Sequence, residues 1–414
     1  MNWVFVTVIV AIFSQLFFVY FIYSNYRYAL KKSKKVRSCY RPSVILIVPC
    51  KGIDAEFEKN IESFYKQAYN NYLLWFVVAD TTDAAYGKLQ ELQNRLSLNS
   101  KAKDVRILTA GPAQSCSQKL HNLLYCYHRI PSDIEIMAFA DSDICVRPDW
   151  LSHIVYPLRK SRFGAASGYR WFVPKKNNLA TVALSAMNAK VTQLLGKNPF
   201  NQAWGGSMAI RVETFRKLGL EKIWAKAVSD DLSLTAAVKK AGQKIAYVPA
   251  CLVASYQQCN FRELFEFGRR QFLITRINSP AVWWFGLLGS LCSMAGQWAA
   301  PAAAFCVPAL KGDKTNLLLL ISLVFFAGEF ARAILRQKMS WTLLKDDRKD
   351  MTAAAAADVA GCWLWTILVF LLMISSAFGR EINWRGVRYK LTCPEETIII
   401  DSGRKSDLEK PSCG

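Results

Sequence analysis

The feature that most restricts the fold of this chain is an apolar run near its start. Trp3 to Tyr23 contains no charged residue. About 20 apolar residues are enough for a helix to cross the hydrocarbon core of a bilayer. A secretory signal peptide is the weaker interpretation, because the positive charges follow the run and no small-residue cleavage site is present. We therefore predict an N-terminal transmembrane anchor within residues 1–30.

A basic cluster follows the apolar run. It extends from Lys31 to Arg37, and the whole chain carries a formal net charge of +22. Basic residues beside a span stay on the cytoplasmic side, which predicts an outside N-terminus and a cytosolic domain after it. The sequence contains no recognisable nucleic-acid-binding module, so we predict no nucleic-acid partner. The positive charge indicates an anionic membrane surface instead.

Composition is consistent with a cytosolic domain joined to further membrane segments. Hydrophobic residues make up 52% of the 414 residues and charged residues 20%. Three apolar segments lie between residues 281 and 378. Three crossings would place the basic tail outside the cell, against the positive-inside rule, so one segment is expected to be re-entrant or doubled back. The 12 cysteines show no paired metal-binding spacing and are interpreted as reduced thiols.

The middle of the chain has the pattern of an α/β domain. Apolar strand-like runs, such as Ser43–Pro49 and Ile136–Ala140, alternate with helical segments. This alternation predicts a mostly parallel sheet with helices on both faces. The predicted parts after the anchor are the α/β domain at 40–260, an amphipathic interfacial helix at 261–280, transmembrane segments at 281–378 and a basic cytosolic tail at 379–414.

Acidic residues stand where two predicted strands end. Asp80 follows one strand, and Asp141 and Asp143 follow another. Side chains two residues apart on a strand point to the same side, and ligands of such sheets bind at the carboxyl ends of the strands. Two carboxylates there suit a divalent cation that carries a diphosphate. A turn or a helix cap is the alternative interpretation for an isolated Asp-x-Asp.

Two later segments carry further candidate site residues. The loop Asn201–Ser207 contains two glycines, which predicts either close approach of the backbone to a ligand or an ordinary turn. Asp230 and Asp231 follow Ser229 and open a helical segment. Ser229 is a candidate N-cap, and carboxylates in a first helical turn are also favoured electrostatically, so this pair has both a structural and a chemical interpretation.

In this order, the motifs resemble those of family 2 glycosyltransferases, most closely the ceramide glucosyltransferase branch. The resemblance covers about Ser43 to Arg276 together with the flanking spans, and it includes Lys51-Gly52-Ile53-Asp54 and the Lys-x-x-Asn-Leu element at Lys119–Leu123. It implies a GT-A fold, a UDP-sugar donor, Mg²⁺ or Mn²⁺, and transfer of a hexose to a membrane lipid such as ceramide. Because glucose is the sugar of that branch, glucose is the hexose we expect.

The resemblance also assigns roles to individual residues. Asp231 would be the general base, and Asp141 and Asp143 would hold the metal. The residues that would bind the nucleotide sugar are Pro49, Lys51, Asp80, Lys119, Asp141 and Arg270. The residues that would form the loop around the sugar and the acceptor are Trp204, Gly205, Gly206 and Asp230.

One family motif is altered, and this leaves two alternatives open. The (Gln/Arg)-x-x-Arg-Trp motif maps onto Arg270 to Ile274, where Leu273 and Ile274 replace the Arg-Trp pair. Arg269 or Arg276 is a candidate substitute for the lost charge. The alternatives to a lipid glycosyltransferase are a processive polysaccharide synthase and a membrane protein that binds nucleotide sugar without turnover.

Overall fold

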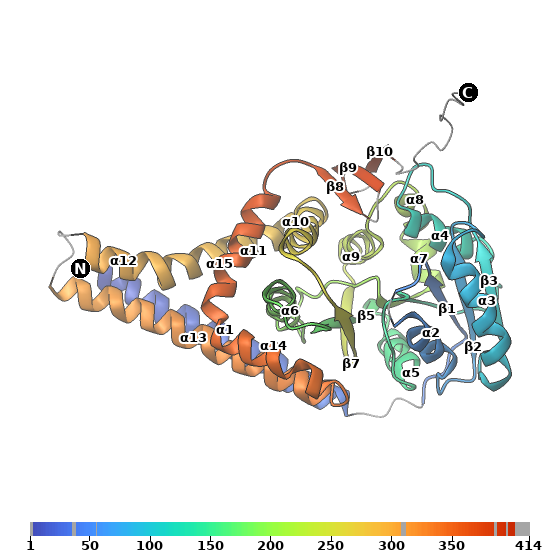
Figure 1. Ribbon diagram of the computed structural model, residues 1–414, viewed down its shortest axis with the longest axis horizontal. Coiled ribbons are helices and arrows are strands. Elements are labelled where there is room, and N and C mark those ends of the chain that lie inside the picture. Colours follow the sequence, from blue (N-terminus) through green and yellow to red (C-terminus); the bar gives the residue numbers. More distant parts are fainter. Residues whose placement is uncertain are drawn as a thin grey trace, which may run out of the picture.

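The structure is a computed structural model, and it describes residues 3–34, 39–54, 56–307, 312–384, 387–394 and 396–401. Figure 1 shows two parts, a broad α/β body and a long projection of helices that ends near the N-terminus. Part of the basic cluster at Lys31–Arg37 and the end of the predicted tail lie outside the described residues.

The body is built around one sheet of seven strands. In chain order the strands are β1 (Val44–Pro49), β2 (Tyr72–Val78), β3 (Asp104–Thr109), β4 (Ile136–Ala140), β5 (Phe163–Pro174), β6 (Ser207–Arg211) and β7 (Lys244–Gln257). Their order across the sheet is β3-β2-β1-β4-β6-β5-β7. Strand β6 pairs antiparallel with β4 and β5, and the other pairs are parallel. The predicted α/β class with a mostly parallel sheet is confirmed.

Helices cover both faces of the sheet. On β1, Val44, Leu46 and Val48 face one buried cluster, and Ile45 and Ile47 face the other. Because both faces are covered, the strand is apolar throughout instead of alternating with polar residues. One face is covered by α2 (Phe57–Tyr65), α3 (Ala84–Leu96) and α5 (Trp150–Val155), and the other by α4 (Gln118–Tyr127), α7 (Val212–Lys217), α8 (Leu220–Trp224) and α9 (Asp230–Lys240).

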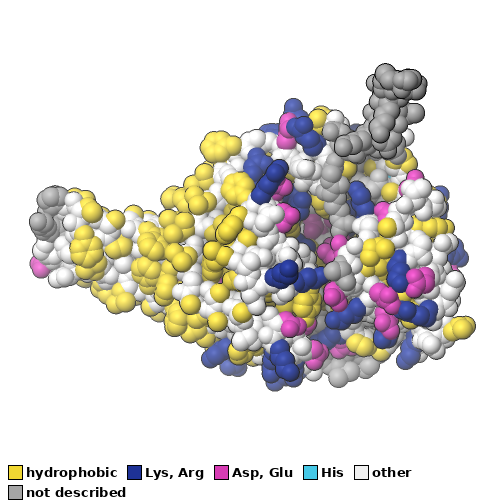
Figure 2. All heavy atoms as spheres, viewed as in Figure 1, with side chains coloured by type: hydrophobic (Ala, Val, Ile, Leu, Met, Phe, Trp, Pro, Cys, Tyr) yellow, Lys and Arg dark blue, Asp and Glu magenta, His cyan; other side chains and the backbone are white. Residues whose placement is uncertain are grey.

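Two long apolar helices form most of the projection. These are α1 (Trp3–Ser33) and α13 (Asp313–Leu343), which are long and apolar enough to cross a membrane. They lie side by side (Figure 1), and Val8 and Ala11 of α1 pack near Ile321 and Phe325 of α13. Hydrophobic side chains cover much of the projection on the face in Figure 2, whereas Lys and Arg side chains gather over the body and the base of the projection.

The remaining apolar segments are interrupted. The segments are α11 (Pro280–Met294), a π-helical turn at Ala295–Ala299, α12 (Ala300–Cys306), α14 (Arg348–Ala360) and α15 (Cys362–Ser376). Together α14 and α15 are apolar enough for a third span, but they are bent by 85° at their junction. The described residues therefore contain two candidate spans, or three if the bent pair is counted as one.

Two helices connect the body to the projection. Helix α6 (Leu179–Thr192) packs through Ala183 and Met187 in a buried cluster that also contains Leu264 of α10 (Phe261–Asn278) and Leu372 of α15. Helix α10 begins with a capping box between Asn260 and Glu263. It coincides with the predicted amphipathic helix, whose place at a membrane interface remains a prediction.

The tail folds back onto the body. Strands β8 (Glu381–Trp384), β9 (Val387–Cys393) and β10 (Glu396–Asp401) form an antiparallel sheet. Tyr389 and Leu391 of this sheet pack in one buried cluster with Val228, Leu232 and Leu273 of the body. The tail sheet and the α/β body consequently lie on the same side of any membrane that the projection crosses.

Candidate active site

The site is assembled from the end of β4 and the starts of α4 and α9. Asp141 follows β4, and Lys119 of α4 lies between two carboxylates from separate elements. The Lys119 Nζ atom is 2.7 Å from Asp141 Oδ1 and 3.0 Å from Asp230 Oδ2. We refer to Asp141, Asp143, Asp230 and Asp231, with Lys119 among them, as the carboxylate cluster.

Burial shapes the electrostatics of the carboxylate cluster. The Asp230 side chain is buried. Burial raises the pKa of Asp230 to about 6, and the nearby Asp231 and Asp141 carboxylates add to the rise, whereas Lys119 opposes it. Burial alone would lower the pKa of Lys119, but Asp141 and Asp230 outweigh it and raise that pKa overall. Lys119 therefore keeps its charge.

The Asp231 side chain is less buried than that of Asp230. Its Oδ2 atom accepts a hydrogen bond from the Gly205 amide at 3.0 Å, and its Oδ1 atom accepts from the Leu232 amide at 2.7 Å and from Ser229 Oγ at 2.5 Å. Ser229 Oγ in turn accepts from the Leu232 amide and caps α9. Because Ser229 already caps the helix, capping does not require Asp231, whose half-buried side chain lines the cavity.

The glycine loop passes very close to the carboxylates. A Cβ atom on Gly205 would lie 2.2 Å from Asp230 Oδ2, and one on Gly206 would lie 2.7 Å from Asp141 Oδ2. No side chain fits at such distances. The glycines therefore allow a close approach to groups of the protein itself, namely the Asp230 and Asp141 carboxylates and the Trp204 ring. The predicted approach to a ligand stays a prediction.

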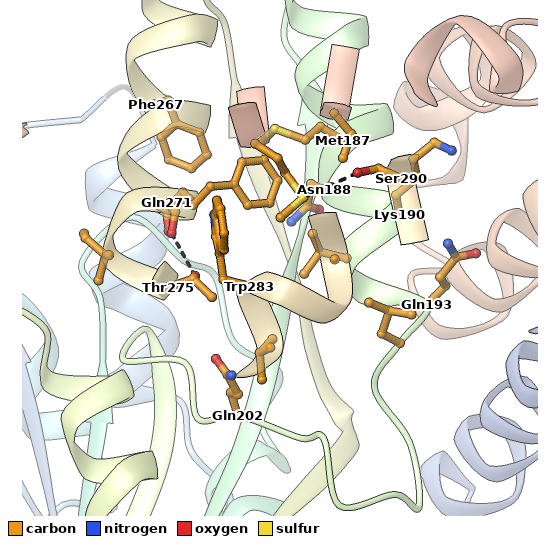
Figure 3. Close-up of a pocket in the computed structure, with 18 of the residues that line it drawn as sticks. Met187, Asn188, Lys190, Gln193, Gln202, Phe267, Gln271, Thr275, Trp283 and Ser290 are labelled. Atoms are coloured by element: carbon orange, nitrogen blue, oxygen red, sulfur yellow. Dashed lines mark hydrogen bonds between the residues drawn. The ribbon is translucent and has the colours of Figure 1, made fainter. Parts of the chain in front are cut away.

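A single cavity of about 1550 Å³ begins at this cluster and continues between the helices of the projection. Figure 3 shows Met187, Asn188 and Lys190 of α6 on one wall and Phe267, Gln271 and Thr275 of α10 on the other. Further along, its wall is mainly apolar. This part is lined by, among others, Phe18 and Ile22 of α1, Trp283 of α11, Ile321 and Phe325 of α13 and Met373 of α15.

Most of the predicted site residues meet at the cavity, but not all. The predicted residues that line it are Pro49, Lys51, Lys119, Asp141, Asp143, Trp204, Asp230, Asp231 and Arg270. Gly205 and Gly206 lie just behind the carboxylates. Asp80 is exposed at the end of β2, where its Oδ1 accepts from the Thr82 amide at 2.8 Å, and its neighbour Ala79 lines the cavity.

The carboxylates of this site can hold a divalent metal only if a bound substrate supplies further metal ligands. Within the described part of the chain, no three His, Cys, Asp or Glu side chains converge on a point that could hold a metal ion. Asp141 and Asp143 nevertheless supply two hard carboxylates on the cavity wall. Mg²⁺ commonly uses one or two carboxylates and takes its other ligands from substrate phosphates and water. The residues are therefore compatible with a metal that arrives with a diphosphate.

The tail sheet supplies part of the wall, which sequence reasoning did not anticipate. Trp384, Val387 and Tyr389 line the cavity. The Arg270 guanidinium carbon lies 6.0 Å from the centre of the Trp384 ring, and its Nη1 donates to the Asn383 carbonyl at 3.1 Å. The sequence offered a signal in the Trp-Arg-Gly-x-x-Tyr pattern that starts at Trp384.

The altered motif has a structural explanation. Leu273 and Ile274 belong to the buried cluster that docks the tail sheet. Neither neighbouring arginine replaces the lost charge at the cavity. Arg269 donates to the carbonyl of Phe378 at 2.9 Å, and Arg276 donates to the carbonyls of Ala377 and Gly379. Both arginines instead hold the segment that leads from α15 to the tail sheet.

Two solved structures show partial similarity to the chain. One is the mannosyltransferase PcManGT from Pyrobaculum calidifontis in complex with GDP-Man and Mn²⁺, at 15% identity and a TM-score of 0.45, covering 89% of this chain and 97% of that one. The other is GalNAc-T7 with UDP, GalNAc and Mn²⁺, at 11% identity and a TM-score of 0.40, covering 54% of this chain and 45% of that one.

The mostly parallel sheet and the carboxylates at the end of its central strand are consistent with a nucleotide-sugar glycosyltransferase, and the two long apolar helices are consistent with a membrane protein. The sequence decides the family. The chain belongs to Glycosyl transferase family 21, which it matches over residues 5–397. The match confirms the resemblance to ceramide glucosyltransferase-like enzymes and spans the body, the projection and most of the tail sheet.

Proposed function

We propose that the protein transfers a hexose, glucose in the first instance, from a UDP-sugar to a hydroxyl group of a membrane lipid such as ceramide. The observation that carries this proposal is the continuity of the cavity. Its polar end holds the carboxylate cluster, and its apolar part lies between helices that are candidate membrane spans. A lipid in the apolar part would present its head group to the carboxylates.

Asp231 is the proposed general base. It would take the proton of the acceptor hydroxyl while that oxygen bonds to the anomeric carbon of the sugar. The bond from this carbon to the diphosphate breaks on the opposite face, which inverts the configuration and releases UDP. Three hydrogen bonds, from Gly205, Leu232 and Ser229, fix the orientation of the Asp231 carboxylate.

Asp141 and Asp143 are the proposed metal ligands. A bound Mg²⁺ or Mn²⁺ would screen the charge that develops on the leaving diphosphate. Lys119 pairs with Asp141 in this structure, and we expect it to donate to a phosphate oxygen of the donor when Asp141 binds the metal. Arg270, another cation proposed for the donor, is oriented by the Asn383 carbonyl.

We also propose a membrane topology with the catalytic body in the cytosol. The tail sheet packs on the body, so the chain between them crosses the membrane an even number of times. Two crossings result if the helical segment from Pro280 to Cys306 leads outward and α13 returns, while the bent α14–α15 pair stays on the cytosolic side. The segment from Pro280 to Cys306 is not among the candidate spans above, so its crossing is part of the proposal. This arrangement resolves the conflict between three apolar segments and the positive-inside rule.

Cysteine labelling in intact cells tests the topology. An impermeant maleimide should label Cys306, at the end of α12, and should reach Cys39 and Cys393 only after the membrane is opened. All three cysteines are exposed. Labelling of Cys393 in intact cells would place the tail outside and refute the proposed topology.

The activity itself is tested with purified protein in nanodiscs, incubated with labelled UDP-sugars and a set of lipid acceptors. The proposal expects a single glycolipid that carries one sugar. A polymer would establish the processive synthase instead. Donor binding without transfer to any lipid or to water would establish the non-catalytic alternative.

A further inference from the structure

A second group of buried charges lies on the cavity wall away from the carboxylate cluster. It consists of Lys190 of α6, Glu329, Arg332 and Arg336 of α13, and Asp358 of α14, and we refer to it as the α13 charge cluster. All but Lys190 are at most 7% exposed, and the Lys190 side chain is 12% exposed. Ionisable groups inside a candidate span are costly and usually have a function.

The five residues form a connected network. Glu329 is 2.5 Å from Lys190 Nζ, 2.8 Å from Arg332 Nη2 and 3.1 Å from Arg336 Nη1. Arg336 also binds both oxygens of Asp358 at 2.7 Å. Helices α6, α13 and α14 are thereby linked, so one role of the network is to join them.

The charges in this network do not balance. Three cations face two carboxylates, which leaves one positive charge in excess. The other hydrogen-bond partners of the cluster are uncharged, namely Gln15, Gln193, Gln337 and Thr366. A buried charge without a counter-charge is strongly unfavourable, so a group of opposite sign is expected nearby.

The excess charge lies on the cavity side of the network. Lys190, Glu329 and Arg332 line the cavity, whereas Arg336 and Asp358, which bind each other, are behind its wall. Among the described residues, the side-chain contacts of Arg332 are with Gln15 and Glu329. A guanidinium group has five N–H donors, so Arg332 has donors left for an oxygen in the cavity.

The surroundings indicate what carries that oxygen. From Glu329 towards Leu318, α13 lines the cavity with Phe325 and Ile321 over about 16 Å, at 1.5 Å per residue. A ligand with an anionic oxygen at Arg332 would thus have apolar wall directly beside it. This combination suits an amphiphile and does not suit a free anion.

We propose that Lys190 and Arg332 bind the phosphate group of a membrane lipid whose acyl chain lies along α13. The head-group contacts of this site differ from those of the proposed donor and acceptor sites, whereas its acyl chain would share the apolar part of the cavity with the acceptor lipid. Binding at Lys190 and Arg332 does not depend on the proposed reaction. A lipid held there would complete the wall of the cavity and compensate the excess charge.

Lipid binding by the purified full-length chain tests this proposal without any activity assay. The probes are phosphatidic acid and diacylglycerol with the same acyl chains, which differ only in the phosphate, and retention is measured by native mass spectrometry. Charge-assisted hydrogen bonds should favour phosphatidic acid by roughly 10- to 100-fold. Equal retention of the two lipids by the wild-type chain would overturn the proposal. Displacement of phosphatidic acid by an equal concentration of inorganic phosphate would overturn its lipid part.

Matched variants separate this site from the basic surface. Arg332→Gln should reduce the preference for phosphatidic acid by about tenfold or more. Lys338→Gln removes one positive charge from an exposed position on the same helix and should leave the preference unchanged. Binding at the surface weakens as salt is added, whereas binding in the buried site should weaken much less. An equal loss in both variants, or a preference abolished by salt, would assign the effect to the surface.

Discussion

The carboxylate cluster and the α13 charge cluster lie on the wall of one cavity, and their excess charges have opposite signs. The first pairs Lys119 with Asp141 and Asp230 and has Asp143 and Asp231 on the same cavity wall, and the second places three cations around two carboxylates. In both clusters the named residues of one sign outnumber those of the other. We propose that each cluster binds a ligand of opposite charge, a metal with a diphosphate in one and a lipid phosphate in the other.

The two clusters also differ in how they are supported. Asp231 is held by the backbone amides of Gly205 and Leu232, which belong to the glycine loop and the start of α9. Lys190 and Arg336 are held by side chains from other helices. A carboxylate that must act on a reacting atom needs a fixed orientation, whereas a charge that only attracts a head group does not.

The largest expected effect comes from substitution of Asp231, the proposed general base. It would decide whether this carboxylate takes part in the reaction. Asp231→Asn keeps the size of the side chain but removes its basicity. It should lower turnover by roughly 100-fold or more at saturating donor, with UDP-sugar binding retained. Turnover is measured by release of UDP, and donor binding by calorimetry.

Two controls separate chemistry from capping. Ser229→Ala removes the N-cap, should cost about 1 kcal/mol of stability and should leave turnover of the folded fraction largely intact. Asp230→Asn, which changes the buried partner of Lys119, should reduce turnover less than Asp231→Asn does. Near-normal turnover of Asp231→Asn would remove this residue from the mechanism.

The second expected effect concerns the proposed metal site and tests whether the carboxylate cluster binds a cation. Asp143→Ala removes a hard oxygen ligand and should weaken donor binding in the presence of Mn²⁺ by about tenfold or more, while binding without metal stays unchanged. Titrations of UDP-sugar with Mn²⁺ and with a chelator measure both values. The same metal dependence in the variant and in the wild type would exclude Asp143 as a ligand.

The third effect tests the close approach of the glycine loop. Gly205→Ala would place a methyl group 2.2 Å from Asp230 Oδ2, so the Lys119–Asp230 pair must shift. We expect turnover to fall about 10- to 100-fold, since small displacements of catalytic groups are costly. Gly87→Ala on α3 is the control, because its Cβ would have no neighbour within 4 Å. Equal activity of the two variants would show that the loop position does not matter.

The sequence predicted the carboxylate cluster but not the α13 charge cluster, and the reason is distance along the chain. Asp141 and Asp143 follow an apolar strand directly, so the local pattern already indicates a sheet edge. Lys190 and Asp358 meet α13 only in the folded chain. The spacing of Glu329, Arg332 and Arg336 by three and four residues did place them on one face of a helix, a signal that we did not use.

The fold could be predicted where the local sequence pattern indicates it, but the prediction missed two elements. The apolar runs Ser43–Pro49 and Ile136–Ala140 are strands β1 and β4, in agreement with the sequence pattern. Helix α6 was missed because most of its residues are buried, including Asn188 and Thr192, and such a helix has no polar stripe. The tail sheet was missed because its strands are short and gain stability from Leu273 and Ile274 of α10, far away in sequence.

The smallest expected effect concerns Trp384, an aromatic residue of the tail sheet. Its ring lies beside Arg270 on the cavity wall, at a distance consistent with a weak cation–π contact. Such contacts contribute about 0.5–1 kcal/mol at exposed sites. Trp384→Ala should therefore raise the KM for the donor about two- to fivefold with little change in kcat, and Trp384→Phe should largely restore it. Leu273→Arg, which returns the arginine of the family motif, should not compensate, because it would bury a charge under the tail sheet. If Leu273→Arg raised activity while Trp384→Ala left the KM unchanged, the tail would have no part in donor binding, and Arg270 would have to be oriented by other residues.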